Sequence, residues 1–141
     1  MIVYAATKQV FMEDSDHDAL VDRISDGFKK QFGKPREGEV RAWKNSLLYM
    51  YKVINDSQIP DNAGVAIEFK LPGSSRRVDF IISGRNEDHK EAAVIIELKQ
   101  WETVQAIVGA EALVNTYVGG AMGPQNHPSY QAWSYASFFQ D

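Results

Sequence analysis

Four charged residues on neighbouring predicted strands could do chemistry together: Glu68, Asp79, Glu97 and Lys99. Glu97 directly follows the apolar run 92–96, and Asp79 interrupts an apolar run in the same way. A carboxylate on a buried strand must be paired, protonated or bound to a metal. Lys99 should point to the same face as Glu97, because side chains alternate along a strand with a period of two.

Carboxylates with a lysine beside them suit the hydrolysis of a phosphodiester. Three carboxylates are enough to hold a hard divalent cation through oxygen, and Mg²⁺ is the natural choice for such a site. A cation held there polarises a phosphoryl oxygen and lowers the pKa of a bound water. The lysine would position that water or neutralise the charge that develops on phosphorus.

The stretch Gly64–Trp101 should position these side chains, because it reads as three successive strands. The first strand alternates, and its apolar face is predicted to carry Val65, Ile67, Phe69 and Leu71. The second apolar face carries Val78, Phe80 and Ile82, and the third carries Val94, Ile96 and Leu98. The predicted strands are Val65–Leu71, Arg76–Ser83 and Ala92–Lys99.

The turn Pro72–Ser75 suggests how the first two strands pair. If Leu71 pairs with Arg76, an antiparallel register places Glu68 opposite Asp79. Glu68 would then join the acidic cluster. The alternative for Glu68 is an ion pair on the surface with Arg77 or Lys70.

Two segments of the chain resemble a nuclease family. Asp79, followed by Glu97-Leu98-Lys99 on the next strand, resembles the PD-(D/E)XK nuclease motif, with Val78 where a proline is usual. Gln131-Ala132-Trp133-Ser134-Tyr135 resembles the QxxxY motif of the RecB-like branch, and the motifs occur in the family's order. The chain also looks like the N-terminal nuclease domain of bacterial proteins in which a RecB-like nuclease precedes a P-loop helicase.

The resemblance implies an α+β fold with a restriction-endonuclease-like mixed sheet flanked by helices, and a metal-dependent nuclease that acts on DNA. The resemblance also implies that the nuclease binds Mg²⁺ or Mn²⁺. The ligands would be Asp79, Glu97 and the Leu98 carbonyl, Lys99 would be catalytic, and Gln131 and Tyr135 would help to hold the lysine or the nucleic acid.

A further acid is expected from the helix before the sheet, because such enzymes often supply a glutamate there. Glu39 resembles that residue, and it lies in the first turn of a helix predicted over Glu37–Ile54. The simpler interpretation of Glu39 is a favourable interaction with the helix dipole.

Each motif also has a structural interpretation. Glu-x-Lys on a strand is common as an ion pair, and a tyrosine on an amphipathic helix, such as Tyr135, usually belongs to a core. The order of the motifs and their strand context favour a nuclease. The alternatives are a nucleic-acid-binding or protein-interaction module on the same fold that does not cut, and an unrelated α+β interaction protein.

Composition is that of an ordinary globular protein. The 141 residues predict a single domain, and 44% hydrophobic with 24% charged residues is typical of that class. No membrane span or signal peptide is evident and cysteine is absent, so we expect a cytoplasmic protein. The net charge of −4 argues against binding nucleic acid through bulk charge. Arg76 and Arg77 are the DNA-contact candidates, because they lie on the strand of Asp79.

The remaining elements are assigned from periodicity and turn residues. The predictions are a short strand or extended arm over 2–6, helices over Ser15–Phe32 and Thr103–Leu113, a short strand over Val114–Val118, a glycine-rich lip or connector over Gly119–Pro124, and a helix from Pro128 to the end, with His127 as its cap.

The chain departs from the family at its end. PD-(D/E)XK folds usually carry another core strand, parallel to the third, after the helix that follows Glu-x-Lys. Either the chain is a fragment of a longer nuclease–helicase protein, or Val114–Val118 supplies that strand. The open edge of Ala92–Lys99 could otherwise be covered by the helix from Pro128 or by a second copy, so a monomer and a symmetric homodimer both remain possible. No P-loop motif is present, which excludes ATP-driven helicase activity from this segment.

Overall fold

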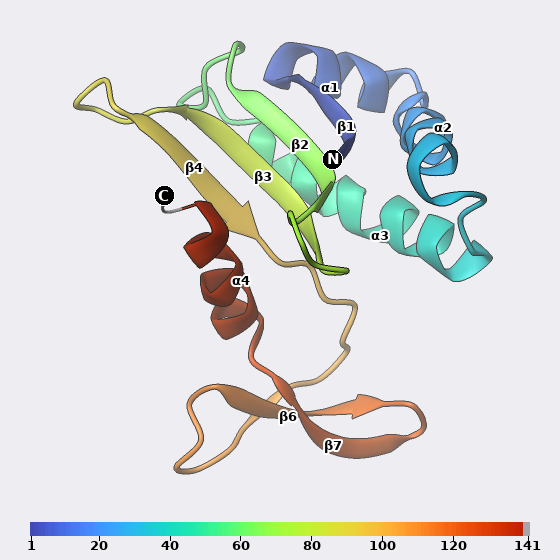
Figure 1. Ribbon diagram of the computed structural model, residues 1–141, viewed down its shortest axis with the longest axis vertical. Coiled ribbons are helices and arrows are strands. Elements are labelled where there is room, and N and C mark those ends of the chain that lie inside the picture. The colour runs from blue at the N-terminus through green and yellow to red at the C-terminus, as the bar shows by residue number, and fades with distance from the viewer. Residues whose placement is uncertain (140–141) are drawn as a thin grey trace.

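Helices cover both faces of an antiparallel sheet in this computed structural model, which describes residues 1–139 (Figure 1). The larger sheet has the order β1 (Ile2–Thr7), β2 (Gly64–Lys70), β3 (Arg77–Arg85) and β4 (Glu91–Ile96). A smaller sheet contains β5 (Gln105–Ala106), β6 (Leu113–Val118) and β7 (Ala121–Asn126). The helices are α1 (Lys8–Asp16), α2 (Leu20–Phe32), α3 (Glu37–Ile54) and α4 (Pro128–Ala136), followed by the 3₁₀ turn η1 (Ser137–Phe139). The predicted α+β class is confirmed.

Two apolar cores form on the two faces of the larger sheet. The first packs α1, α2 and α3 against β1, β2 and β3, with Phe11, Ile24 and Phe80 fully buried at its centre. The second lies under α4, where Tyr135 packs with Leu71, Val78 and Ile81. Figure 1 shows α4 in front of β4 and α3 behind the sheet. None of the helices described between residues 1 and 139 is long and apolar enough to span a membrane.

The β2–β3 hairpin has the predicted register. Ile67 pairs with Phe80 and Phe69 with Val78, so Glu68 and Asp79 stand at the same level between these pairs. The amide of Leu71 donates to the Arg76 carbonyl at 3.1 Å and closes the turn. This confirms the pairing inferred from the length of the turn.

The predicted faces of this hairpin are wrong beyond Glu68. Ile67 packs in the core of α1–α3, whereas Phe69 and Leu71 pack in the core under α4. On the second strand, Phe80 and Ile82 pack in the first core, but Val78 packs in the second, so the predicted face is wrong at Val78 as well. On β2 the switch occurs at the backbone of Glu68, whose φ of 55° lies in the left-handed region. That conformation is rare for a residue with a side chain and breaks the alternation of the strand. It turns the next side chains to the opposite face.

The N-terminal helix differs from the prediction over Ser15–Phe32. α1 begins at Lys8, capped by Thr7, whose hydroxyl accepts from the amide of Val10 at 3.3 Å. Ser15 is inside α1 rather than at a cap, because its hydroxyl donates to the Phe11 carbonyl. Asp18, with φ of 55°, lies in the turn that separates α1 from α2.

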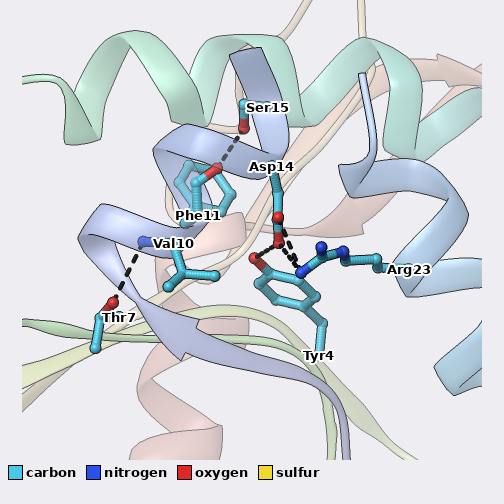
Figure 2. Close-up of polar contacts among 7 residues, drawn as sticks. All are labelled: Tyr4, Thr7, Val10, Phe11, Asp14, Ser15 and Arg23. Atoms are coloured by element: carbon cyan, nitrogen blue, oxygen red, sulfur yellow. Dashed lines mark hydrogen bonds and ion pairs between the residues drawn. The ribbon is translucent and has the colours of Figure 1, made fainter. Parts of the chain in front are cut away.

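A polar cluster around the buried Asp14 carboxylate ties β1, α1 and α2 together (Figure 2). The Tyr4 hydroxyl donates to Oδ2 of Asp14 at 2.7 Å, and the Arg23 guanidinium lies 3.0 Å from Oδ1. Burial, and then the Asp14 carboxylate, raise the pKa of Tyr4. The cluster holds the first helices against the sheet, since a buried carboxylate needs such partners.

The segment 103–126 folds differently from the prediction. Thr103–Leu113 is not helical, because it contains β5 and a turn at Gly109. Val114–Val118 is a strand, as expected, but as part of β6 it pairs with β5 and β7 rather than with β4. The glycines at 119 and 120 have positive φ and form the hairpin turn into β7, so the predicted lip is regular structure. Figure 1 shows this hairpin apart from the larger sheet.

The prediction of a mixed sheet is also wrong, because every strand pair within residues 1–139 is antiparallel. β4 is an edge strand, and no strand in the described part pairs with its outer side. α4 contacts β4 and begins at Pro128, with the His127 ring accepting from the Ser129 amide. The sequence predicted that this helix continues to the end of the chain. Residues 140–141, which that prediction includes, lie outside the described range.

Candidate active site

Asp79 and Glu97 meet where β4 ends. The pairing of Phe80 with Ile96 places Asp79 opposite Glu97, one position further along the two strands. The Leu98 amide donates to Oδ2 of Asp79 at 2.9 Å. The Lys99 ammonium lies 2.9 Å from Oε1 of Glu97. The structure therefore brings together the aspartate, glutamate and lysine that the sequence singled out.

The two carboxyls lie in a buried and electrostatically costly position. The Glu97 side chain is 5% exposed, and its Oε2 has no hydrogen-bond partner among the described residues. Burial, together with the neighbouring Asp79, raises the pKa of Glu97 to about 7 although Lys99 opposes the shift. Burial also raises the pKa of Asp79, against the Leu98 amide and Lys99. The Asp79 charge contributes to the raised pKa of Glu97, because two adjacent carboxylates repel each other unless one is protonated or a cation lies beside them.

Glu68 stands level with Asp79 but is held by other partners. Its Oε1 accepts from the Trp43 indole at 3.1 Å, and its Oε2 lies 3.3 Å from the Arg77 guanidinium. Burial raises the pKa of Glu68, and the Asp79 charge adds to that effect. The Glu68 carboxyl thus interacts electrostatically with Asp79. Its ion pair, however, is with Arg77, as the alternative interpretation of Glu68 predicted.

Glu39 is held by the same arginine. Its Oε2 accepts from the Arg36 amide at the start of α3, and its Oε1 lies 3.1 Å from Arg77. The Arg77 guanidinium also lies 5.1 Å from the ring centre of Phe28. A phosphate would have to compete with both Glu39 and Glu68 for this side chain. Of the two predicted DNA contacts, Arg76 is the exposed one.

A small cavity of about 120 Å³ lies between α3 and the part of the sheet that carries Glu68 and Asp79. Asp79 and Leu98 lie on the sheet side, and Trp43 lies on the helix side. The other polar side chains that line the cavity are Glu39, Glu68, Ser46 and Gln100. The Gln100 amide donates to the Ser46 hydroxyl at 3.4 Å and joins the segment after β4 to α3. The cavity thus places Glu39 and Glu68 next to Asp79 without direct bonds between the three carboxylates.

The donor set suits a hard divalent cation. Asp79 and Glu97 supply adjacent carboxylate oxygens, and the unpartnered Oε2 of Glu97 is a buried acceptor that lacks a positive partner. Mg²⁺ or Mn²⁺ prefers such oxygens and keeps several waters. Within residues 1–139, however, no three His, Cys, Asp or Glu side chains are grouped as a ready-made metal site. Further ligands would have to come from water or from main-chain carbonyls such as that of Leu98.

Gln131 and Tyr135 pair with each other on α4. The Gln131 amide donates to the Tyr135 hydroxyl at 2.7 Å, and the buried Tyr135 ring packs against Val78, next to Asp79. In the described chain, neither forms a hydrogen bond or an ion pair with Asp79, Glu97 or Lys99. The motif therefore anchors α4 to the sheet behind the acids, and a role in holding the lysine remains a prediction.

Two tryptophans near the acids were missed as site residues. Trp43 lies on the helix predicted over Glu37–Ile54 and was not singled out, yet its indole donates to Glu68. Trp101 was named only as the end of the stretch Gly64–Trp101, yet the Lys99 ammonium lies 5.7 Å from its ring centre. Its position two residues after Lys99 was the available signal, because alternate side chains in an extended segment share a face.

Comparison with protein families, with curated proteins and with solved structures finds no match to this chain.

Proposed function

We propose that the protein is a metal-dependent nuclease that hydrolyses phosphodiester bonds in DNA. The observation that carries the proposal is the buried Asp79–Glu97 pair with the Lys99 ammonium beside it and one carboxylate oxygen unsatisfied. Buried ionisable groups with strongly shifted pKa values and an unsatisfied partner are typical of functional sites.

Each residue has a specific role in the proposal. Asp79 and Glu97 would hold Mg²⁺ or Mn²⁺ between their carboxylates. A cation there would supply Lewis acidity at the phosphoryl oxygen and lower the pKa of the attacking water. Lys99 presents its ammonium to the charge that develops on the phosphate and orients the attacking water. The Leu98 amide fixes the Asp79 carboxylate through its 2.9 Å bond.

A second candidate is a module on the same fold that binds but does not cut. Two observations favour it: Glu39 and Glu68 are both held by Arg77, and the described residues contain no group of three metal-ligating side chains. Such a module would bind Mn²⁺ weakly or not at all.

The proposal is tested by incubating the chain with linear and circular DNA in the presence of Mg²⁺, Mn²⁺ or EDTA. Cleavage with a divalent cation, lost in EDTA and in Asp79→Asn and Glu97→Gln, is the expected result. The matched control is Asp88→Asn, which changes an exposed carboxylate in the β3–β4 loop. Cation-independent cleavage, or equal cleavage by the parent and Asp79→Asn, would rule out the proposed site. No cleavage together with no Mn²⁺ binding would favour the second candidate.

A further inference from the structure

A groove of about 700 Å³ leads away from Lys99 between α3 and the segment that follows β4. Lys99 and Trp101 line one wall, and Lys44 and Tyr49 line the other. The volume is within the range of about 300–1,000 Å³ typical of ligand sites. The groove is thus a large enough surface to receive part of a substrate that reaches the candidate active site.

The groove displays aromatic rings that have no place in either core. Tyr49 is 65% exposed and points from α3 with Lys52 5.5 Å from its ring centre. Trp101 is half-buried under the Lys99 ammonium. The neighbouring Leu48 is also exposed. Exposed aromatic side chains gathered beside a candidate site indicate a bound partner rather than a folding role.

The chemistry of these walls distinguishes between kinds of nucleic acid. An aromatic side chain in a groove can stack on a base only if that base is unpaired, because the faces of paired bases are covered by their neighbours in the duplex. A duplex presents phosphates instead and requires a strongly basic surface. Two cationic side chains, Lys44 and Lys99, line the groove together with the anionic Glu102. The chain as a whole has a net charge of −4. Its surface therefore fits stacking better than the charge-driven binding of a duplex.

We propose that this groove binds one unpaired strand of nucleic acid, with bases stacked on Trp101 and Tyr49 and a phosphate presented to Lys99. The inference rests on the proposed function and specifies the form of its substrate. Lys44 and Lys52 meet the phosphates that flank the stacked bases. Asn45 and Gln100, which also line the groove, offer amides to base edges or sugar hydroxyls.

The test is a binding measurement on the whole chain in EDTA, where no cleavage can occur. The probes are fluorescein-labelled oligonucleotides of about 12 nucleotides, within the length that such grooves bind. We compare oligo(dU), oligo(U) and a duplex of the same length by anisotropy, with tryptophan quenching as a second readout. Tighter binding of a single strand than of the duplex is expected, and the tighter of the two single strands identifies the sugar.

Variants locate the binding surface. Trp101→Ala and Tyr49→Ala should each raise the Kd for the single strand about fivefold or more, as expected for the loss of one stacked base. Trp101→Phe should retain most of the affinity because it keeps a stacking face. The matched controls are Trp133→Ala on α4 and Tyr117→Ala on β6, which remove exposed aromatic rings outside the groove and should change the Kd less than twofold.

Ionic strength gives an independent check. Three lysines, Lys44, Lys52 and Lys99, are expected near the bound nucleic acid. A plot of the logarithm of affinity against the logarithm of salt concentration should therefore have a slope of about −2. Tighter binding of duplex, equal losses in the control variants, or no binding of any oligonucleotide would overturn the inference, and the last result would indicate a protein partner. Because the assay contains no metal, binding without later cleavage would refute only the proposed function. Cleavage that is unaffected by Trp101→Ala and Tyr49→Ala would refute only the groove.

Discussion

The Lys99 ammonium lies 2.9 Å from one carboxylate oxygen of Glu97, while the other oxygen of Glu97 has no hydrogen-bond partner within residues 1–139. The Glu97–Lys99 pair is therefore only half satisfied, and the Glu97 carboxyl is buried beside the Asp79 carboxyl, whose charge helps to raise its pKa. A half-satisfied buried acid is stabilised by a proton or by a cation. This relationship makes proton and metal competitors for one site.

We predict that Mn²⁺ binding releases a proton and depends on pH. Since the pKa of Glu97 is about 7, metal affinity should rise about tenfold per pH unit between pH 5 and 7 and then level off. Calorimetry in buffers of different ionisation enthalpy measures both the affinity and the number of protons released. Glu97→Gln should remove the pH dependence along with most of the affinity. Affinity that is constant from pH 5 to 7 would contradict the raised pKa of Glu97.

The same shift predicts how stability varies with pH. The folded chain holds the Glu97 proton more tightly than the unfolded chain, where the ordinary pKa is 4.5. The resulting stabilisation is fully present below pH 4.5 and is lost as the pH rises through about 7. Urea denaturation without metal should therefore show a decrease in stability from pH 5 to 7.5 that is smaller in Glu97→Gln. Added Mn²⁺ should restore the stability at pH 7.5. A parent and variant with parallel pH profiles would count against the raised pKa.

Lys99→Ala should abolish most cleavage while it leaves folding and metal binding largely intact. The ammonium is not a ligand, and its loss should lower kcat by about 10²–10³, the effect of removing one donor to a developing oxyanion. Lys90→Ala, which removes an exposed lysine from the loop before β4, is the matched control. Steady-state cleavage rates and Mn²⁺ titrations of both variants provide the measurement. Equal rates for the parent and Lys99→Ala would exclude Lys99 from the reaction.

Arg77→Ala should destabilise the fold although its neighbour Arg76 should not. Arg77 joins Glu39 on α3 to Glu68 on β2 and lies against the Phe28 ring. Its removal leaves two partly buried carboxylates without their cation, which should cost about 1–3 kcal/mol of unfolding free energy. Arg76→Ala, at an exposed position, should change stability by less than about 0.5 kcal/mol. Urea midpoints at constant slope measure both. Equal effects of the two substitutions would mean that the network does not support the fold.

The meeting of Asp79, Glu97 and Lys99 could be inferred from the sequence because strand period and turn length constrain which side chains are neighbours. Helix α3 was predicted with the observed bounds, since its apolar spacing is regular and Pro35 precedes it. The switch of faces at Glu68 was not predicted. It depends on a positive φ at a residue that is not glycine, which no local pattern indicates.

Helix α1 was missed for a related reason. Its first residue, Lys8, reads as a surface residue, but it is buried, and its ammonium donates to the carbonyls of Asp56 and Ile59, both at 2.7 Å. Such long-range bonds override local propensity. The segment Thr103–Leu113 has helical spacing, yet it forms β5 and a turn, because Gly109 adopts positive φ and the strand pairs with β6.

The last prediction concerns the outer edge of β4. Val94 is 58% exposed, residues 92–96 carry neither charge nor proline, and no described strand covers this side. A bare, uncharged edge is a template for pairing with another chain, so we expect two copies to associate through antiparallel β4 strands. Light scattering should give the mass of a dimer at high concentration, and hydrogen exchange at 94–98 should slow as the dimer forms.

Val94→Lys places a charge on this edge and should keep the chain monomeric without unfolding it. The matched control is Val53→Lys, because Val53 is similarly exposed at 55% but lies on α3. In an antiparallel pair with β3, alternate amides of β4 point outward, so the monomeric variant should show fast exchange at every second residue. A parent that stays monomeric, with fast exchange at all amides from 94 to 98, would contradict the pairing of β4 with β3. Because that pairing sets Asp79 opposite Glu97, the same result would also remove the geometric basis of the candidate active site.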